Sequence, residues 1–127
     1  MTVMRLLWIG LILMTAVPAF SQNWARASYS TNGKMVEIVD LTGLQSCKIS
    51  NVSGKVSKIK VSDSSAAITL KREDERLDFR IPLSAVKPED RGPLFDHLVT
   101  KGNTLEIAGY RCTDGEPPSA FSIRRVY

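Results

Sequence analysis

The sequence has few of the residues on which active sites depend. It contains one histidine, His97, and two cysteines among 127 residues. No Gly-x-Ser-x-Gly motif surrounds a serine, and a catalytic triad would have His97 as its only histidine base. The eight glycines are scattered, so a glycine-rich phosphate-binding loop is also absent. We therefore expect no enzyme, no catalytic residue and no cofactor.

Metal-binding and redox motifs are missing as well. Cys47 and Cys112 have neither Cys-x-x-Cys spacing nor a second pair of ligands, which argues against a zinc or thioredoxin-type centre. The acidic residues 73–75 are flanked by basic ones and cannot converge on one ion from a tight turn, so they indicate a solvated hairpin tip. His97 lies beside Leu94 and Leu98, which are at helical spacing from each other, and is expected to flank a packed face. We predict no metal site.

A long apolar run occurs only at the beginning of the chain. Leu6–Val17 follows Arg5 and precedes Pro18, and small residues stand three and one positions before a cut after Ser21. This is the pattern of a secretory signal peptide. As a helix the run would reach only about 18 Å, less than the roughly 30 Å of a bilayer core. We expect residues 1–21 to be removed, no integral membrane span, and a periplasmic or secreted mature chain.

Export changes the interpretation of the two cysteines. In an oxidising compartment, two thiols without other partners usually pair with each other, which predicts a disulfide between Cys47 and Cys112. Closing a loop of about 65 residues would stabilise the fold by on the order of 4 kcal/mol in the chain-entropy model. A catalytic or intermolecular thiol is the alternative.

The mature chain has the pattern of a mainly β domain with one short helix. Residues 22–33 are expected to form an N-terminal arm, and residues 34–127 a single domain. Alternating apolar and polar residues predict strands, and the Gly92-Pro93 pair predicts the helix start. A bulge near Ser57 would correct a change of phase there. The expected elements are strands at 35–41, 47–49, 55–61, 68–71, 77–81, 104–110 and 120–127, and a helix within 88–102.

From Gly54 onward the order is three strands, a helix and two strands, and the first strand begins with Gly54-Lys55-Val56. This arrangement resembles the OB-fold, a five-stranded Greek-key barrel, in the form of its small exported bacterial members. The resemblance implies an OB-like barrel with an extra N-terminal β-hairpin. It also implies a binding surface on the second and third strands and adjoining loops, where OB-folds bind oligonucleotides or oligosaccharides. An antiparallel sandwich or roll with one peripheral helix is the alternative architecture.

The distribution of charge is the most informative feature. The formal net charge is +4, and residues 41–62 contain no acid. If the alternating apolar residues of three neighbouring strands point inward, four cations share the outward face: Lys58, Lys60, Lys71 and Arg80. Such a face attracts anions, although outward lysines also keep a sheet soluble. In an OB-like topology the ligand-binding set would further include Tyr110, Arg111 and Arg124.

Three functions are compatible with these residues. The first is an exported, non-enzymatic binding module whose basic face docks an anionic envelope polymer or another exported protein. The second is an inhibitor or assembly subunit that makes contact through the proline-containing loop of residues 113–119. The third is a metal-dependent hydrolase, for which Asp78, Arg80 and Glu106 are suitable residue types but form no recognisable motif. Few outward aromatics are available for stacking, which argues against a nucleic-acid ligand.

Overall fold

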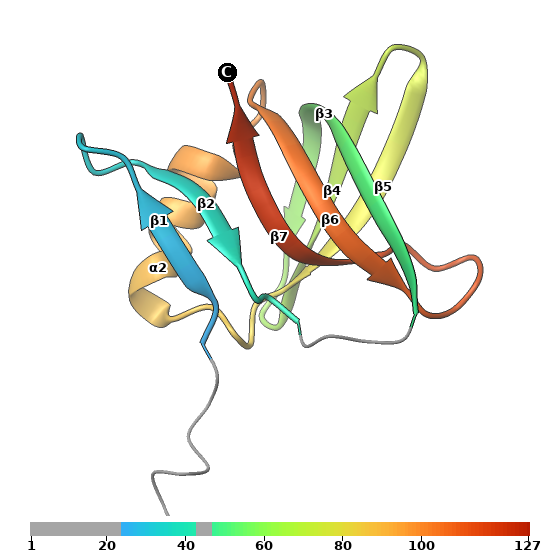
Figure 1. Ribbon diagram of the computed structural model, residues 1–127, viewed down its shortest axis with the longest axis horizontal. Coiled ribbons are helices and arrows are strands. Elements are labelled where there is room, and N and C mark those ends of the chain that lie inside the picture. The colour runs from blue at the N-terminus through green and yellow to red at the C-terminus, as the bar shows by residue number, and fades with distance from the viewer. Residues whose placement is uncertain (1–23, 43–46) are drawn as a thin grey trace, which may run out of the picture.

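The chain folds into one β-sheet with a short helical segment, as a computed structural model of residues 24–42 and 47–127 shows (Figure 1). The predicted signal peptide of residues 1–21 lies outside these described ranges, in which no helix is long and apolar enough to cross a membrane. The elements are β1 (Arg26–Tyr29), β2 (Met35–Val39), β3 (Lys48–Val61), β4 (Ser65–Arg72), β5 (Glu75–Pro82), α2 (Pro88–Pro93), η1 (Leu94–Leu98), β6 (Thr104–Arg111) and β7 (Ser119–Val126). The expected mainly β class is thus confirmed.

Strands β3 to β7 are hydrogen-bonded in a ring. Strand β4 pairs with β3 and β5, and β6 pairs with β3 and β7, all of them antiparallel. The ring closes where β7 meets β5 in a parallel pairing of Ser119 with Arg80. Figure 1 shows β1, β2 and α2 together on one side of these five strands. The order of three strands, helical segment and two strands agrees with the expectation.

Strand β3 is longer than the sequence indicated. We expected separate strands at 47–49 and 55–61, but the strand runs without a break from Lys48 to Val61. Its first half pairs with β6 and its second half with β4, so it needs a bend rather than a turn. Gly54 supplies that bend, because a Cβ atom there would lie 3.1 Å from the Cβ atom of Leu70. The predicted bulge is confirmed, since the register with β4 shifts between Val56 and Lys58.

The N-terminal region also differs from the expectation. Residues 26–29 are not an irregular arm but strand β1, which pairs with β2. The N-terminal hairpin is therefore made of β1 and β2, and not of residues 35–41 with 47–49. Strand β2 is held by the buried side chains of Met35 and Ile38, whereas β1 is short and mostly exposed. A four-residue strand with little burial leaves no alternating pattern to detect.

The helical segment begins earlier than expected. Pro88 occupies its first turn, and Pro93, which we expected at the start, lies inside it. Because Pro93 has no N–H, the α-helical hydrogen bonding is interrupted there, and the chain continues as a turn of π-helix, η1. The segment ends at Leu98, where the side-chain amide of Asn103 donates to the carbonyl oxygens of residues 97 and 98 at 2.9 and 3.0 Å.

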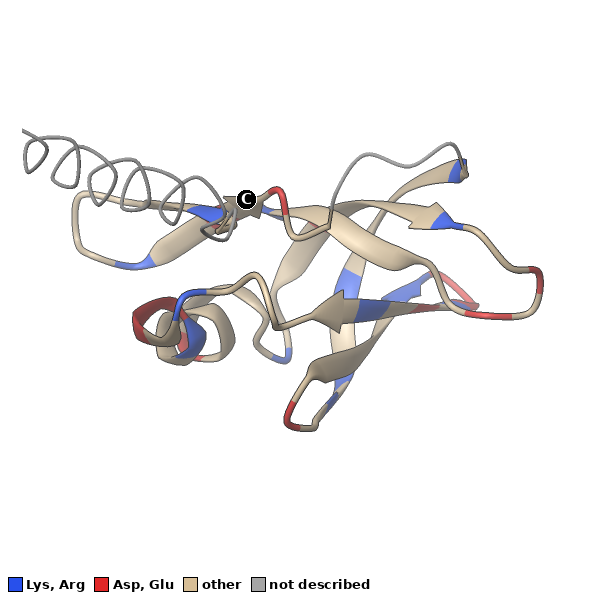
Figure 2. Ribbon diagram, turned by 90° about the horizontal axis from the view of Figure 1, so that it is seen from below, with Lys and Arg blue, Asp and Glu red and all other residues tan. Residues whose placement is uncertain are grey.

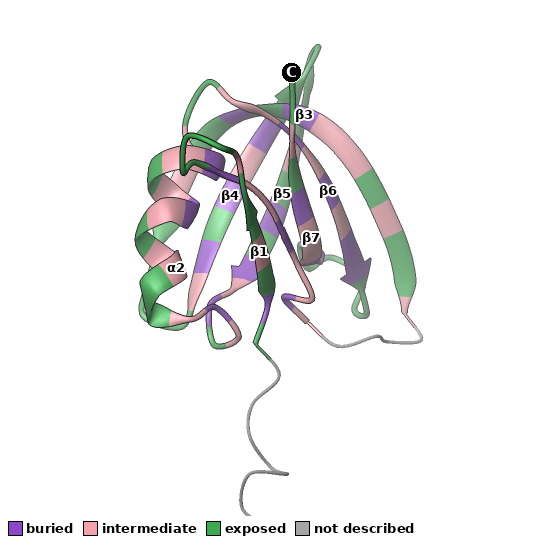
Figure 3. Cartoon of the chain, turned by 60° about the vertical axis from the view of Figure 1, so that its left-hand side comes forward, coloured by how far each residue is buried: buried purple, intermediate pink, exposed green. Residues whose placement is uncertain are grey.

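One continuous core lies inside the ring and extends under the N-terminal hairpin. Buried residues alternate with exposed ones along the strands (Figure 3). Of the positions expected to face inward, Ile68, Leu70 and Phe79 are buried and Ile59 and Leu77 are partly buried. The exception is the last residue of β3, Val61, whose 53% exposure reflects its position at the strand end beside a turn. The buried core side chains leave the opposite faces of β3, β4 and β5 mainly to polar residues, with Ile49 near the start of β3 and Ala67 of β4 as exposed apolar exceptions.

Gly109 of β6 gives a direct test of the packing between β6 and β7. A Cβ atom at this position would lie 2.6 Å from the backbone oxygen of Ser119, so Gly109→Ala must displace the backbone of β7. We expect a loss of about 1–3 kcal/mol in the free energy of unfolding, measured by urea denaturation. Gly92→Ala is the control, because a Cβ atom there meets nothing within 4 Å apart from its two chain neighbours, and at this exposed position the free energy of unfolding should change by less than about 0.5 kcal/mol. Equal stability of both variants would contradict this account.

Candidate functional site

The outer surface of β3, β4 and β5 carries most of the predicted ligand-binding residues. The strand register aligns residues across the three strands in rows. The rows are Lys60–Ala67–Arg80, Lys58–Thr69–Asp78 and Lys55–Lys71–Arg76. The inward neighbours of these residues are the apolar core positions, so the rows lie on one outward face. We call this surface the basic face.

Four cations expected together, Lys58, Lys60, Lys71 and Arg80, do lie on the basic face. The structure adds two that the sequence interpretation missed, Lys55 and Arg76. Lys55 precedes the bulge and is out of phase with the later lysines, which hid it. Arg76 is in phase with Arg80, but its position beside the charged hairpin tip led us to assign it to the turn. Extending the alternation of outward and inward residues from Arg80 back to the start of β5 would have placed Arg76 on the outward face.

The basic face holds a single carboxylate among these rows. Asp78 accepts a hydrogen bond from the Thr69 hydroxyl at 2.7 Å, so this carboxylate is oriented along the sheet surface. The ion pairs within residues 24–42 and 47–127 join other residues: Arg26–Asp40, Arg72–Glu75 and Arg124–Glu106. The cations of the face are exposed and face solvent without a matching set of acids. In Figure 2 the acidic positions lie mainly at loop tips and on the helical segment.

Two open depressions meet at β5. One, of about 440 Å³, lies on the basic face between Lys58, Lys71 and Asp78. The other, of about 330 Å³, lies between β5 and the loop that joins β6 to β7, and its wall includes Val52, Phe79 and Pro117. Arg76 and Asp78 line both depressions. A ligand on the basic face could therefore extend around β5 into the second depression, which we call the loop cleft.

The other three predicted residues have separate environments. Tyr110 is only 8% exposed and packs edge-on against Phe121, with ring centroids 5.8 Å apart, so its ring is not free to stack on a ligand. Arg111 ends β6 and lines the loop cleft, close to the predicted set. Arg124 lies on β7 and donates to Glu106 at 2.5 Å, and this contact raises the pKa of the guanidinium. The structure thus brings Arg111 to the site but not Tyr110 or Arg124.

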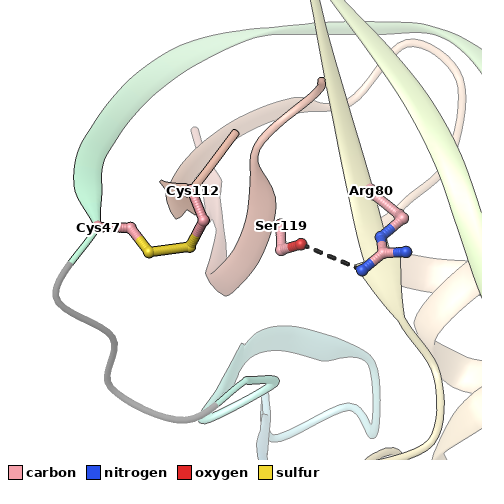
Figure 4. Close-up of a disulfide and its surroundings, with 4 residues drawn as sticks. All are labelled: Cys47, Arg80, Cys112 and Ser119. Carbon is pink, nitrogen blue, oxygen red and sulfur yellow. Dashed lines mark hydrogen bonds between the residues drawn. A yellow bond between two sulfur atoms is a disulfide. The ribbon is translucent and has the colours of Figure 1, made fainter. Parts of the chain in front are cut away.

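The predicted disulfide is confirmed. Cys47 and Cys112 are bonded, with Cα atoms 4.8 Å apart, and they join the residue before β3 to the residue after β6 (Figure 4). The adjoining ladder pair is Lys48 with Arg111. The bond therefore fixes the first residue of the loop that forms one wall of the loop cleft. At the other end of this loop the Arg80 guanidinium donates to the Ser119 hydroxyl at 3.5 Å, also drawn in Figure 4.

The arrangement of titratable groups shows no assembled metal site in the described ranges, where no three His, Cys, Asp or Glu side chains lie together as ligands. Glu106, one of three residues considered for a hydrolase, is engaged by Arg124 on β6 and β7. Asp78 lies on β5 and is engaged by Thr69. The carboxylates of Glu106 and Asp78 are therefore bound to different partners on different strands and do not form one site. His97 lies on η1, away from the strands of the basic face.

A further depression lies between β1 and α2, beside Trp24 and Lys87. Here the Tyr29 hydroxyl donates to the Asp90 carboxylate at 2.6 Å. Desolvation, followed by this hydrogen bond and the negative charge of Asp90, raises the pKa of Tyr29 to about 12. The contact ties the first strand to the start of the helical segment.

The sequence matches no protein-family model, and no curated protein is significantly similar to it.

Tyr29 provides a pH-dependent test of the contact between β1 and α2. The phenol has a pKa of about 12 in the folded chain against 10.0 for an unperturbed tyrosine side chain, so the folded state holds this proton more tightly. The resulting stabilisation is present below pH 10 and is lost as the pH rises through about 12. We expect ultraviolet titration to show a phenol ionising near pH 12 that disappears in Tyr29→Phe and moves lower in Asp90→Asn. Identical titrations of the unchanged protein and Asp90→Asn would refute the contact.

Proposed function

We propose that this chain is an exported, non-enzymatic binding module. Its basic face docks an anionic component of the cell envelope or another exported protein. The observation that carries the proposal is the concentration of six exposed cations on three adjacent strands with one carboxylate among them. Neighbouring strands are about 4.8 Å apart and alternate residues about 7 Å apart, so these cations are spaced closely enough to act on one polyanion together.

Two features support the exported setting. The apolar run that predicts a signal peptide precedes the folded domain, and the Cys47–Cys112 bond is the type of crosslink that persists in oxidising compartments. A polyanionic partner outside the cytoplasm would meet the basic face without competition from cytoplasmic nucleic acids. We infer that the mature chain begins after Ser21 and acts in the periplasm or outside the cell.

We further propose that the ring of β3 to β7 is an OB-like barrel. The pairing of β3 with both β4 and β6, the parallel contact of β7 with β5, and the helical segment between the third and fourth strands of the ring all favour this assignment. The basic face then spans the first three barrel strands and includes the second and third, where members of that fold class commonly bind ligands. This agreement supports a binding role for the face.

A matched pair of variants tests the proposed function. The triple change Lys58→Ser, Lys60→Ser and Lys71→Ser should weaken binding to immobilised heparin, used as a representative polyanion, by roughly 3- to 100-fold, since each exposed pair contributes about 0.2–1 kcal/mol. The control is Lys34→Ser, Lys87→Ser and Lys101→Ser, which removes the same charge away from the basic face. The salt concentration needed for elution measures both. Equal losses in the two variants would show that net charge, not the face, governs binding.

A further inference from the structure

The backbone of β5 has an open edge next to the loop cleft. The hairpin between β4 and β5 closes with the pair Arg72 and Glu75, and in an antiparallel ladder the hydrogen-bonded pairs then recur at every second residue. Leu77 and Phe79 therefore direct their backbone groups toward β4, whereas Arg76, Asp78 and Arg80 direct theirs to the other side. The Arg80 N–H agrees with this assignment, because it donates to the Pro118 carbonyl oxygen at 2.9 Å.

The pairing of β5 with β7 stops at that point. Ser119 and Arg80 are the only residues of the two strands in register within the described ranges, and Pro117 and Pro118 have no N–H to donate. The backbone groups of Arg76 and Asp78 on this side have no backbone partner among residues 24–42 and 47–127. The backbone N–H groups and carbonyl oxygens of Arg76 and Asp78 thus face the loop cleft, spaced two residues apart as along the edge of a β-strand.

The walls of the loop cleft have different chemistry on their two sides. Four consecutive residues, Arg76 to Phe79, form one wall, so the cleft runs along the strand edge. Leu77, Phe79 and Val52 contribute apolar surface toward the inside of the ring. The cleft is lined by two guanidinium groups, those of Arg76 and Arg111, and by an equal number of carboxylates, those of Asp78 and Glu116. The excess positive charge comes from the adjoining basic face, at Lys58 and Lys71.

We propose that the open edge of β5 takes up an extended, acidic segment of a partner polypeptide as an additional strand. Its backbone would bond to Arg76 and Asp78, and its alternate side chains would point in opposite directions. Apolar side chains would contact Leu77 and Phe79 in the cleft, and acidic ones would meet the cations of the basic face. This inference rests on the proposed function for its charge preference, and it names an exported protein, rather than an envelope polymer, as the partner.

The unpaired backbone groups decide between these partners. A polysaccharide can satisfy positive charge, but it lacks N–H groups and carbonyl oxygens repeating at about 7 Å, which the edge of β5 matches. A peptide strand offers both on the same side at that repeat. The closure of the ring by β7 at Arg80 shows that this edge already accepts a parallel strand.

Four peptides test the proposal with the oxidised mature protein. The first is an acetylated hexapeptide that alternates glutamate and valine. The second and third are its analogues N-methylated on all valines or on all glutamates, and the fourth has the same composition with the glutamates and valines in separate blocks. Strand addition predicts that the alternating peptide and one N-methylated analogue bind, because only one set of N–H groups faces β5. The other analogue and the block peptide should bind at least tenfold more weakly.

Hydrogen exchange locates the peptide on the protein. The amides of Arg76 and Asp78 should become protected when the alternating peptide is added, whereas those of Leu77 and Phe79 are already protected by β4. Arg76→Pro should weaken binding at least fivefold relative to Arg76→Ser, since both changes remove the charge but only proline removes the N–H. This N–H does not belong to the ladder with β4, and the peptide series remains decisive if Arg76→Pro fails to fold.

The outcomes separate this inference from the proposed function. If all four peptides bind equally well, and only the triple lysine variant binds them more weakly, strand addition is overturned and the basic face remains as a polyanion site. Absence of binding by every peptide at millimolar concentration, with heparin binding retained, would do the same. Heparin binding equally reduced in the triple lysine variant and its control would refute the basic face itself, whatever the peptides do.

Discussion

The structure depends on one bent strand that is shared by two neighbours. At Lys55, strand β3 pairs with Lys71 of β4 and also with Thr104 of β6. The ladder with β4 and the ladder with β6 therefore overlap at this residue. The bend requires the close approach of Gly54 to Leu70, which leaves little room for a side chain. The shift of register that follows turns Val56 inward and keeps Lys58 outward. The core and the basic face therefore have a common origin in this short stretch.

The basic face follows from the same alternation that builds the core. Every outward position of β5 between Arg76 and Arg80 is charged, because Leu77 and Phe79 occupy the inward ones. The only acid among them, Asp78, is held by Thr69 of the neighbouring strand and lies within a surface of cations. Burial thus determines where the charges lie, while the choice of lysine and arginine over acids determines what the surface attracts.

Features with a strong local pattern could be predicted from the sequence, and features that depend on distant contacts could not. The disulfide followed from export and from the lack of any other role for Cys47 and Cys112, and the outward lysines followed from a period of two. Strand β1 lacked such a pattern because its pairing with β2, rather than its own burial, defines it. The helix start was misplaced because Pro88 and Pro93 both suit a first turn, and only the tertiary fold distinguishes them. Tyr110 was predicted as a ligand residue, but Phe121, eleven residues later, covers it.

The open edge of β5 is consistent with a chain that avoids pairing with itself. Exposed strand edges invite association, and proteins commonly guard them with charged side chains or proline. Here Arg76 and Asp78 are the charged residues of the edge, Pro117 and Pro118 of the neighbouring loop have no N–H to pair with it, and the disulfide fixes the start of that loop. A second copy of β5 would bring its own arginines against these cations, so like charges oppose self-pairing. A strand that carries acids at alternate positions meets no such repulsion, and the same charges that guard the edge therefore select the partner that can use it.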